Sequence, residues 1–478
     1  MAKLIVYNAW LVDSRTDSAG ALAIADKNIR AVFIGNCTDE AAARRCAAAT
    51  FGSDAETDFL DARGLTLMPA FVDMHAHFRY PGQTQKEDLD SGLRAAAAGG
   101  FATVVLMPNT TPVVSTQGMA QDIMREAEEK HLARVFQTVS ITKDFAGTDT
   151  AEIGRLDALA VPVITEDGHD VERAAVMLEA MQKAGERGIM VSCHCEDVSF
   201  AQAARPLRER ALALMRQHGI PADRYDLPPT DVPAAVNAEI DESLTAANRL
   251  LAFAEDIATE RNIALAERAK CHVHIAHCST ASSMAAVRRA KLRIAAGATP
   301  AGFSVSAEVT PHHLSLTGTQ APLLRALVNP PLRSETDRRA LIDAIKDGTV
   351  DVISTDHAPH TAADKAAGSP GFTGLETAFA VCNTVLTKAE GLPLTDLSRL
   401  MSDTPARLLR LRTGRLSPGY AADFVLVDPN EQWTVDSAQF LSKGTSTPQN
   451  GATLTGRVHA TFCDGKKVFE NARGPACP

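Results

Sequence analysis

The sequence predicts an α/β protein: a (β/α)8 barrel of the TIM type with a small β-sandwich domain formed from both chain termini. Three observations lead to this prediction. Short apolar runs alternate with longer segments of helical period between residues 66 and 411. Eight such strand–helix units can be counted, which is the number a closed parallel barrel needs. The two ends of the chain instead carry short strand-like runs separated by Asp, Gly and Asn.

The eight apolar runs are the predicted barrel strands. They lie at 68–73, 102–107, 134–141, 162–165, 188–193, 272–276, 303–309 and 350–354. Segments rich in Ala, Leu, Glu and Arg separate them and are predicted to be helices, at 88–98, 119–131, 171–186, 261–270, 281–296 and 334–346.

The domain organisation follows from this change of pattern. We expect residues 66–411 to form the barrel, and residues 1–65 and 412–478 to form the two parts of one small β domain. One interval, 196–259, is too long for a simple connection and is predicted to be an insertion. Within it, 219–236 is rich in Pro and Asp and is predicted to be a loop with a helix on either side.

Composition excludes several classes of protein. The chain has 478 residues, of which 45% are hydrophobic and 22% charged, so a folded globular protein is expected. A net charge of −10 argues against nucleic acid or an anionic membrane as the partner. The nine cysteines form no CxxC pair, and the amino terminus has the pattern of a strand; both favour a cytoplasmic location.

Potential metal ligands follow most of the predicted barrel strands. Barrel enzymes build their active sites at these strand ends, so the placement itself suggests a site. His75 and His77 are two residues apart in a strand and therefore point to the same side. The other candidates are Glu166, Asp167, His194, His277 and Asp356. Each alone is a weak signal, but together imidazoles and carboxylates suit a pair of divalent ions such as Zn²⁺. His272 and His274 are interpreted as barrel packing or surface residues.

Several motifs resemble the amidohydrolase superfamily, and specifically its class I dihydroorotases. The segment DMHAHFRYPG at 73–82 is followed by MPNT at 107–110. Further matches are EVTPHHL at 308–314, NPPLR at 329–333 and STDHAPH at 354–360. The resemblance covers almost the whole chain apart from the predicted insertion.

The resemblance implies a metal-dependent hydrolase that acts on cyclic amides. It would interconvert N-carbamoyl-L-aspartate and L-dihydroorotate in pyrimidine biosynthesis, with two Zn²⁺ ions per chain. His75 and His77 would hold the more buried ion, and His194 and His277 the second. Asp356 would ligate the first ion and act as general acid and base for a hydroxide shared by the two ions.

The residue that bridges the ions differs from many relatives, which use a carboxylated lysine. No lysine occurs at 161–170. By resemblance to class I dihydroorotases an aspartate takes this role, and Asp167 aligns best. Glu166 is the alternative, because a slip of one residue would exchange the two.

The resemblance also implies a substrate site. Arg79, Asn109 and His360 would bind the α-carboxylate, and Asn329 would contact the ring. The guanidinium of Arg79 suits a carboxylate because it donates two parallel hydrogen bonds. Tyr80 and Leu327 stand where the family often has an acidic residue and a lysine.

Two alternatives stay open. The first is another cyclic amidase, a dihydropyrimidinase (hydantoinase) or an allantoinase, whose substrates lack the α-carboxylate that Arg79 would read. The second is a non-catalytic homologue that serves as a scaffold for aspartate transcarbamoylase. A homodimer and a complex with aspartate transcarbamoylase are both considered as assemblies.

Overall fold

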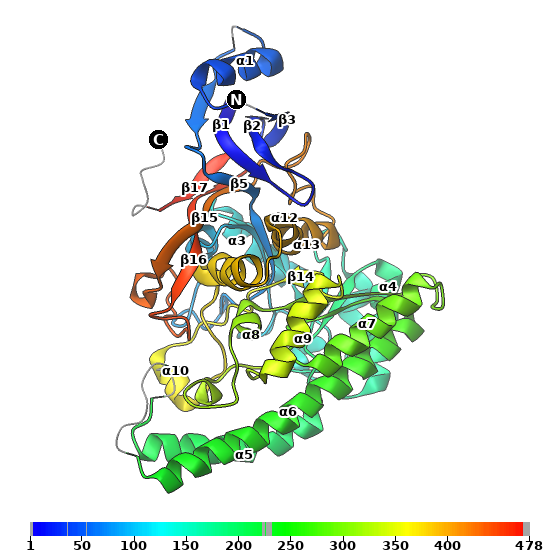
Figure 1. Ribbon diagram of the computed structural model, residues 1–478. Helices are drawn as coiled ribbons and strands as arrows, with labels where there is room; N and C mark the ends of the chain where they lie inside the picture. Colours follow the sequence, from blue (N-terminus) through cyan, green and yellow to red (C-terminus); the bar gives the residue numbers. More distant parts are fainter. Residues whose placement is uncertain (1–2, 36, 54, 222–224, 226–231, 472–478) are drawn as a thin grey trace.

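A central barrel, a β domain made from both chain ends and a projecting helical pair make up the molecule (Figure 1). The computed structural model describes residues 3–35, 37–53, 55–221, 225 and 232–471. Blue and red segments lie together at the top of Figure 1, which places the amino-terminal and carboxy-terminal strands side by side.

The barrel consists of parallel strands in chain order. They are β6 (Phe71–Ala76), β7 (Phe101–Leu106), β8 (Arg134–Gln137), β9 (Val139–Ser140), β10 (Val163–Thr165), β11 (Met190–Cys193), β12 (His272–Ile275), β13 (Ser304–Val309) and β14 (Val352–Ile353). β8 and β9 together form the third strand of the barrel: β8 pairs with β7, and β9 pairs with β10. A parallel bridge between Ala76 and His357 joins the last strand to the first. The structure therefore confirms the predicted (β/α)8 barrel.

Helices surround the barrel. The longer ones are α2 (Leu89–Ala98), α3 (Gln117–Glu128), α4 (Ala174–Arg187), α7 (Ala281–Ala295) and α9 (Glu335–Lys346); the shorter are α8 (Pro311–Ser315), α10 (Ala362–Ala367), α11 (Ala378–Cys382), α12 (Leu394–Ser398) and α13 (Thr404–Leu408). Capping residues fix where they begin: Asp88 and Ser334 each form a capping box, with Ser91 and Asp337 respectively.

Strands from both chain ends form one eight-stranded sheet. They are β1 (Lys3–Val12), β2 (Asp17–Ala25), β3 (Asn28–Ile34), β4 (Asp58–Asp61), β5 (Thr66–Pro69), β15 (Phe424–Thr434), β16 (Thr453–Cys463) and β17 (Lys466–Glu470). β5 joins the two halves because it pairs with both β1 and β15. Apolar side chains from both halves share one core, for example Ile24, Ile29 and Phe424. The helix α1 (Glu40–Phe51) packs against β1 and β2.

The first predicted strand, 68–73, is split between the two parts of the molecule. Met68 lies in β5 of the terminal sheet, whereas Phe71 begins the first barrel strand. Between them, the Ala70 N–H donates to the Asp423 carbonyl at 3.0 Å. Both short strands are fully buried, so their apolar run gives no sign of the break.

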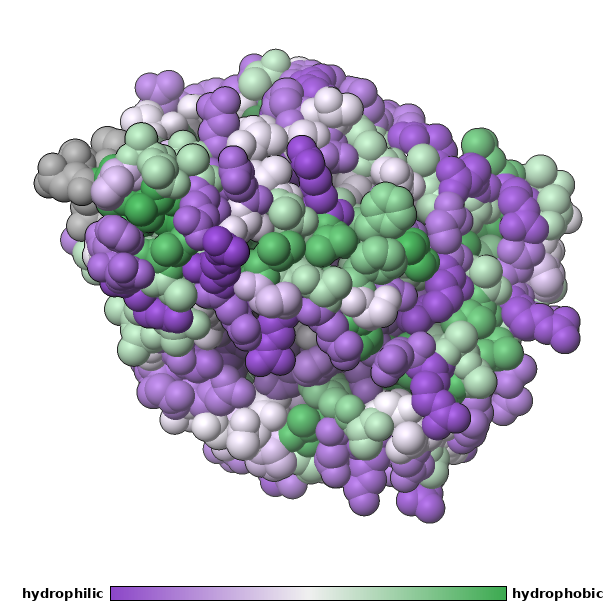
Figure 2. Space-filling model, turned by 90° about the horizontal axis from the view of Figure 1, so that it is seen from below, coloured by the Kyte–Doolittle hydropathy of each residue, from purple (hydrophilic) through white to green (hydrophobic). Residues whose placement is uncertain are grey.

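The predicted insertion forms a long helical pair, α5 (Val198–Gln217) and α6 (Ala234–Ala269). Within the predicted 219–236 loop, residues 222–224 and 226–231 lie outside the described residues, and 234–236 already belong to α6. The pair packs against the connection that follows β13: Arg325 in that connection donates to Asp241 of α6 at 2.8 Å. Figure 2 shows the molecule from the end where this pair lies, with a band of apolar residues between more extensive polar areas. Among the described helices, none is both long and apolar enough to cross a membrane.

Candidate metal centre and active site

Six side chains converge at the carboxyl ends of the barrel strands. His75 lies near the end of β6 and His77 just beyond it, and both point to one side because they are two residues apart. The remaining side chains follow other strands: Asp167 after β10, His194 after β11, His277 after β12 and Asp356 after β14. All six are buried.

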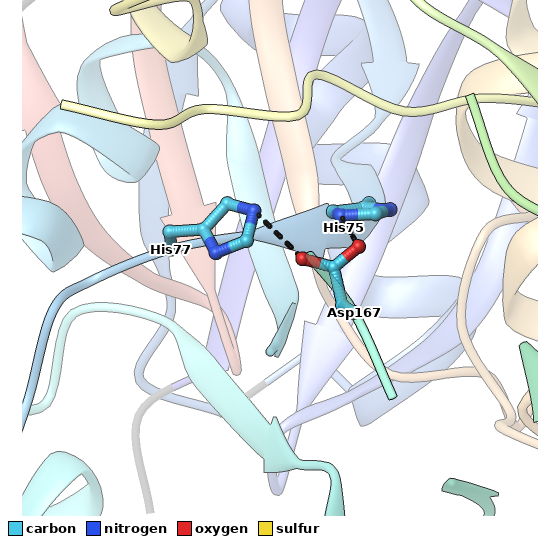
Figure 3. Close-up of side chains that lie close together, drawn as sticks. All are labelled: His75, His77 and Asp167. Atoms are coloured by element: carbon cyan, nitrogen blue, oxygen red, sulfur yellow. Dashed lines mark ion pairs between the residues drawn. The ribbon is translucent and has the colours of Figure 1, made fainter. Parts of the chain in front are cut away.

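The Asp167 carboxylate lies between the imidazoles of His75 and His77 (Figure 3). Its Oδ1 is 3.2 Å from His75 Nε2, and its Oδ2 is 3.5 Å from His77 Nε2. Asp356 approaches the same pair, with Oδ1 3.1 Å from His77 Nε2 and 3.6 Å from His75 Nε2. Two imidazoles and two carboxylates therefore face one point.

A second group shares the same aspartate. His194 Nδ1 and His277 Nε2 lie 2.8 Å apart, and they are 3.5 and 3.7 Å from Asp167 Oδ1. Asp167 thus contacts both histidine pairs. Burial opposes ionisation of Asp167, but His75, His194 and His277 outweigh it and hold the pKa of this carboxyl well below its usual value.

The arrangement fits divalent metal ions. Two ligands of one tetrahedral zinc lie about 3.3 Å apart when each bond is about 2.0–2.1 Å long. The contacts that His75 and His77 make with Asp167 and Asp356, 3.1 to 3.6 Å, are in that range. The buried His75 Nε2 forms no hydrogen bond within the part of the chain that is described. Such a nitrogen, aimed at two carboxylates, is suited to a cation.

Glu166, the alternative to Asp167, lies outside this cluster. Its Oε2 accepts a hydrogen bond from the Thr142 N–H at 2.9 Å, and its Oε1 accepts from the Thr142 hydroxyl. Burial raises the pKa of Glu166 to about 7. The geometry therefore favours Asp167 as the shared carboxylate.

Arg79 and His360 lie together beside the cluster. Arg79 Nη2 is 3.1 Å from His360 Nε2, and Arg79 Nε donates to the Pro359 carbonyl at 3.2 Å. Burial lowers the pKa of Arg79 to about 10, so the guanidinium still carries its charge at neutral pH. Yet within the described ranges it forms no ion pair with a carboxylate. A buried cation without a counter-ion is suited to an anionic ligand.

The two predicted asparagines occupy opposite sides of the centre. Asn109 Oδ1 is 2.9 Å from His77 Nδ1, and its Nδ2 donates to Asp167 at 3.2 Å. Asn329 Nδ2 donates to Glu196 at 2.9 Å and lies 3.4 Å from His194 Nε2. Asn109 is thus bound to candidate metal ligands, whereas Asn329 lies at the second histidine pair.

Sequence reasoning gave no role to two acidic residues that contact the site. Glu308, on β13, lies 2.9 Å from His75 Nδ1, and Glu196 accepts the hydrogen bond from Asn329. Glu308 belongs to the EVTPHHL segment. A charged residue inside a strand that otherwise holds only valine, alanine and serine was the available signal for it. Glu196 had no comparable signal, because its partner is 133 residues away in the sequence.

A parallel barrel with histidines and aspartates at its strand ends is the architecture of a hydrolase that uses metal ions. This chain belongs to the amidohydrolase family, whose sequence pattern matches residues 66–468.

Individual proteins show which members of the family this chain is similar to. A dihydroorotase from Clostridium botulinum is 35% identical over 469 residues, which cover 98% of this chain and 100% of the relative. A dihydroorotase from Bacillus subtilis is 36% identical over 427 residues, covering 88% and 91%. Among solved structures, an L-hydantoinase (dihydropyrimidinase) from Arthrobacter aurescens matches with a TM-score of 0.78 and 23% identity, covering 100% of this chain and 97% of its own. This last similarity supports the fold alone.

Proposed function

We propose that this chain is a dihydroorotase, which interconverts N-carbamoyl-L-aspartate and L-dihydroorotate in the cytoplasm. The observation that carries the proposal is the buried guanidinium of Arg79, which lies beside the candidate metal centre without a carboxylate partner in the described structure. Its position suits a substrate that has a carboxylate next to the reacting amide. The dihydroorotase relatives, 35% and 36% identical, support the same substrate.

Zn²⁺ is the proposed metal, with two ions per chain. Imidazole and carboxylate are ligands that zinc accepts, and the Asp167 carboxylate contacts both histidine pairs. His75, His77 and Asp356 would hold one ion, and His194 and His277 the other. When bound, the ions would supply an activated water and polarise the amide carbonyl.

The protein residues bind the substrate and move the proton. Arg79, Asn109 and His360 hold the α-carboxylate, and Asn329 holds the ring, so that the amide faces Asp356. In the hydrolytic direction Asp356 takes the proton from the attacking water and gives it to the leaving amide nitrogen. Ring closure follows the same path in reverse. The buried setting excludes bulk water and strengthens these polar contacts.

Hydrolysis of L-dihydroorotate, followed by ultraviolet absorbance on purified protein of known metal content, tests the proposal. Turnover of dihydroorotate that exceeds turnover of hydantoin and allantoin is expected, because only dihydroorotate carries the carboxylate. Faster turnover of either control substrate would assign the chain to another cyclic amidase. Metal-loaded protein without activity on any of them would favour a non-catalytic scaffold.

Assembly is a separate proposal. The chain would act as a homodimer or in a complex with aspartate transcarbamoylase. Light scattering of the purified chain, alone and mixed with that enzyme, distinguishes a dimer, a mixed complex and a monomer by molar mass.

A further inference from the structure

A row of polar side chains lies inside the barrel below the candidate metal centre. Inward positions of such barrels are usually filled by Val, Ile and Leu. Here β12 carries His272 and His274, and β13 carries Ser306 and Glu308. The two strands are parallel neighbours, with His274 opposite Ser306. His274 and Glu308 are each 1% exposed, so a polar row replaces part of the apolar core.

The contacts within this row connect it to the metal centre. His272 Nε2 and His274 Nδ1 each lie 2.8 Å from Ser306 Oγ. His274 Nε2 lies 3.2 Å from Glu308 Oε2. The other oxygen, Oε1, lies 2.9 Å from His75 Nδ1. The row therefore runs from the amino-terminal end of β12 to His75 at the carboxyl end of β6.

Glu308 also contacts a second candidate ligand. Its Oε1 accepts a hydrogen bond from the backbone N–H of His277 at 3.2 Å. His277 has a φ of +32°, a backbone conformation that residues other than glycine rarely adopt. Such a backbone persists only where its surroundings hold it. Glu308 thus contacts one residue from each of the two histidine pairs.

The donors around Glu308 define which ring nitrogen of His75 is free to bind a metal ion. A carboxylate can only accept, and two N–H groups, of His75 Nδ1 and of the His277 backbone, point at one oxygen. With its proton on Nδ1, His75 leaves the lone pair of Nε2 toward Asp167 and Asp356. Metal-bound histidines commonly have such a partner, which fixes the tautomer and the ring orientation.

We propose that Glu308 is a positioning residue: it orients His75 and the backbone of His277 for metal binding, and His274 and Ser306 hold Glu308 in place. The inference rests on the metal centre of the proposed function and adds a role for a residue outside the ligand set. It also reassigns His274 from barrel packing to support of that centre.

Metal affinity tests the proposal without reference to turnover. Apoprotein is titrated with Co²⁺ and with Zn²⁺ against a competing chelator, and the visible spectrum of bound Co²⁺ reports ligand geometry. Glu308→Gln keeps the size of the side chain but removes its negative charge. We expect its metal dissociation constant to rise about 10- to 100-fold, the usual effect of losing such a partner. The Co²⁺ spectrum should change, and part of the turnover should return at high metal concentration.

Two further variants keep the test decisive. Ser306→Ala removes only a hydroxyl, which contacts His274, and His274 in turn contacts Glu308. This variant is suitable if Glu308→Gln does not fold. It should weaken metal binding about three-fold or more. Glu431→Gln is the matched control, because Glu431 Oε2 lies 2.7 Å from His459 Nε2 in the terminal sheet, away from the centre. Its metal affinity should equal that of the wild type.

The outcomes separate this inference from the proposed function. If the wild-type protein binds no metal, both the proposed function and the inference are wrong. Wild-type protein that binds metal, with folded Glu308→Gln of equal affinity and equal spectrum, would overturn the inference alone. If only Ser306→Ala folds, an affinity within two-fold of the wild type would overturn it as well.

Discussion

Glu166 and Asp167 are consecutive residues whose carboxylates have entirely different neighbours. Asp167 Oδ1 lies 3.2 Å from His75 Nε2, whereas Glu166 Oε2 accepts from the Thr142 N–H at 2.9 Å. Successive side chains at the end of a strand point to opposite sides, so only one of the two can face the barrel mouth. The choice that the sequence left open between them is therefore a matter of strand geometry.

Exchange of each carboxylate for its amide tests this difference. Asp167→Asn should lose metal and reduce dihydroorotate turnover by at least about 100-fold, because both proposed ions share this carboxylate. Glu166→Gln should retain its metal and lose less than about 10-fold, since its amide can still bond to Thr142. Metal analysis and steady-state kinetics on both purified variants check the prediction. Equal losses in the two variants would contradict the assignment of Asp167.

Removal of a ligand and of the proposed acid–base group should have separable effects. His75→Ala should bind less metal and lose turnover. Asp356→Asn should retain metal through the histidines but lose the proton acceptor, a change worth about 10²- to 10⁴-fold. Metal content, turnover and circular dichroism of both variants are compared with the wild type. Normal turnover in a folded sample of either variant would refute the proposed site.

Arg79 should determine the preference for a substrate carboxylate. Arg79→Ala should reduce kcat/KM for dihydroorotate by about 100-fold or more, because a charged carboxylate would lose its paired hydrogen bonds. Arg79→Lys should recover only part of this loss, since an ammonium cannot form the two parallel bonds. Arg94→Ala is the control, because Arg94 forms an exposed pair with Asp90. Unchanged kcat/KM in Arg79→Ala would rule out Arg79 as the residue that binds the substrate carboxylate.

Glu376 should make stability depend on pH. Burial raises the pKa of Glu376 to about 7, despite hydrogen bonds from the backbone N–H groups of Leu441 and Ser442. The folded protein therefore holds this proton more tightly than the unfolded chain does. Its stabilising effect is complete below the ordinary glutamate pKa of about 4.3, and it is lost as pH rises to about 7.

The comparison with Glu376→Gln isolates this effect, since the amide does not titrate. The free energy of unfolding of the wild type, relative to this variant, should fall between about pH 4.3 and pH 7 and then level off. Urea unfolding at several pH values measures the difference. Glu128→Gln, at an exposed position of α3, serves as the control. A wild-type-minus-variant difference that does not change with pH would exclude the raised pKa.

Phe71 should be important for stability at the junction of barrel and terminal sheet. Its side chain is fully buried, and its ring lies 5.5 Å from the rings of both Phe101 and Phe379. Phe71→Ala should reduce the free energy of unfolding by about 3–5 kcal/mol, through lost burial and the cavity left behind. Chemical denaturation checks this. A loss below about 1 kcal/mol would show that the neighbouring rings refill the space.

Much of the fold could be predicted because the barrel repeats one pattern. Each strand is a short apolar run and each helix a longer periodic segment, so local sequence is sufficient to count them. The split at Ala70 was not predictable, since strands on both sides of it are fully buried and give no alternation. The pairing of β5 with β15 likewise joins residues more than 350 positions apart, such as Pro69 and Phe424.

The residue types of the candidate site could be predicted from the sequence, but the contacts that orient these residues could not. The sequence by itself determined that histidines and aspartates follow the strands, because strand direction brings all carboxyl ends to one face. Only the tertiary structure decided that Asp167 rather than Glu166 faces the histidines, that Arg79 is buried beside His360, and that Glu308 contacts His75. These are distances between side chains from different strands, and the sequence spacing along one strand does not fix the distance to another.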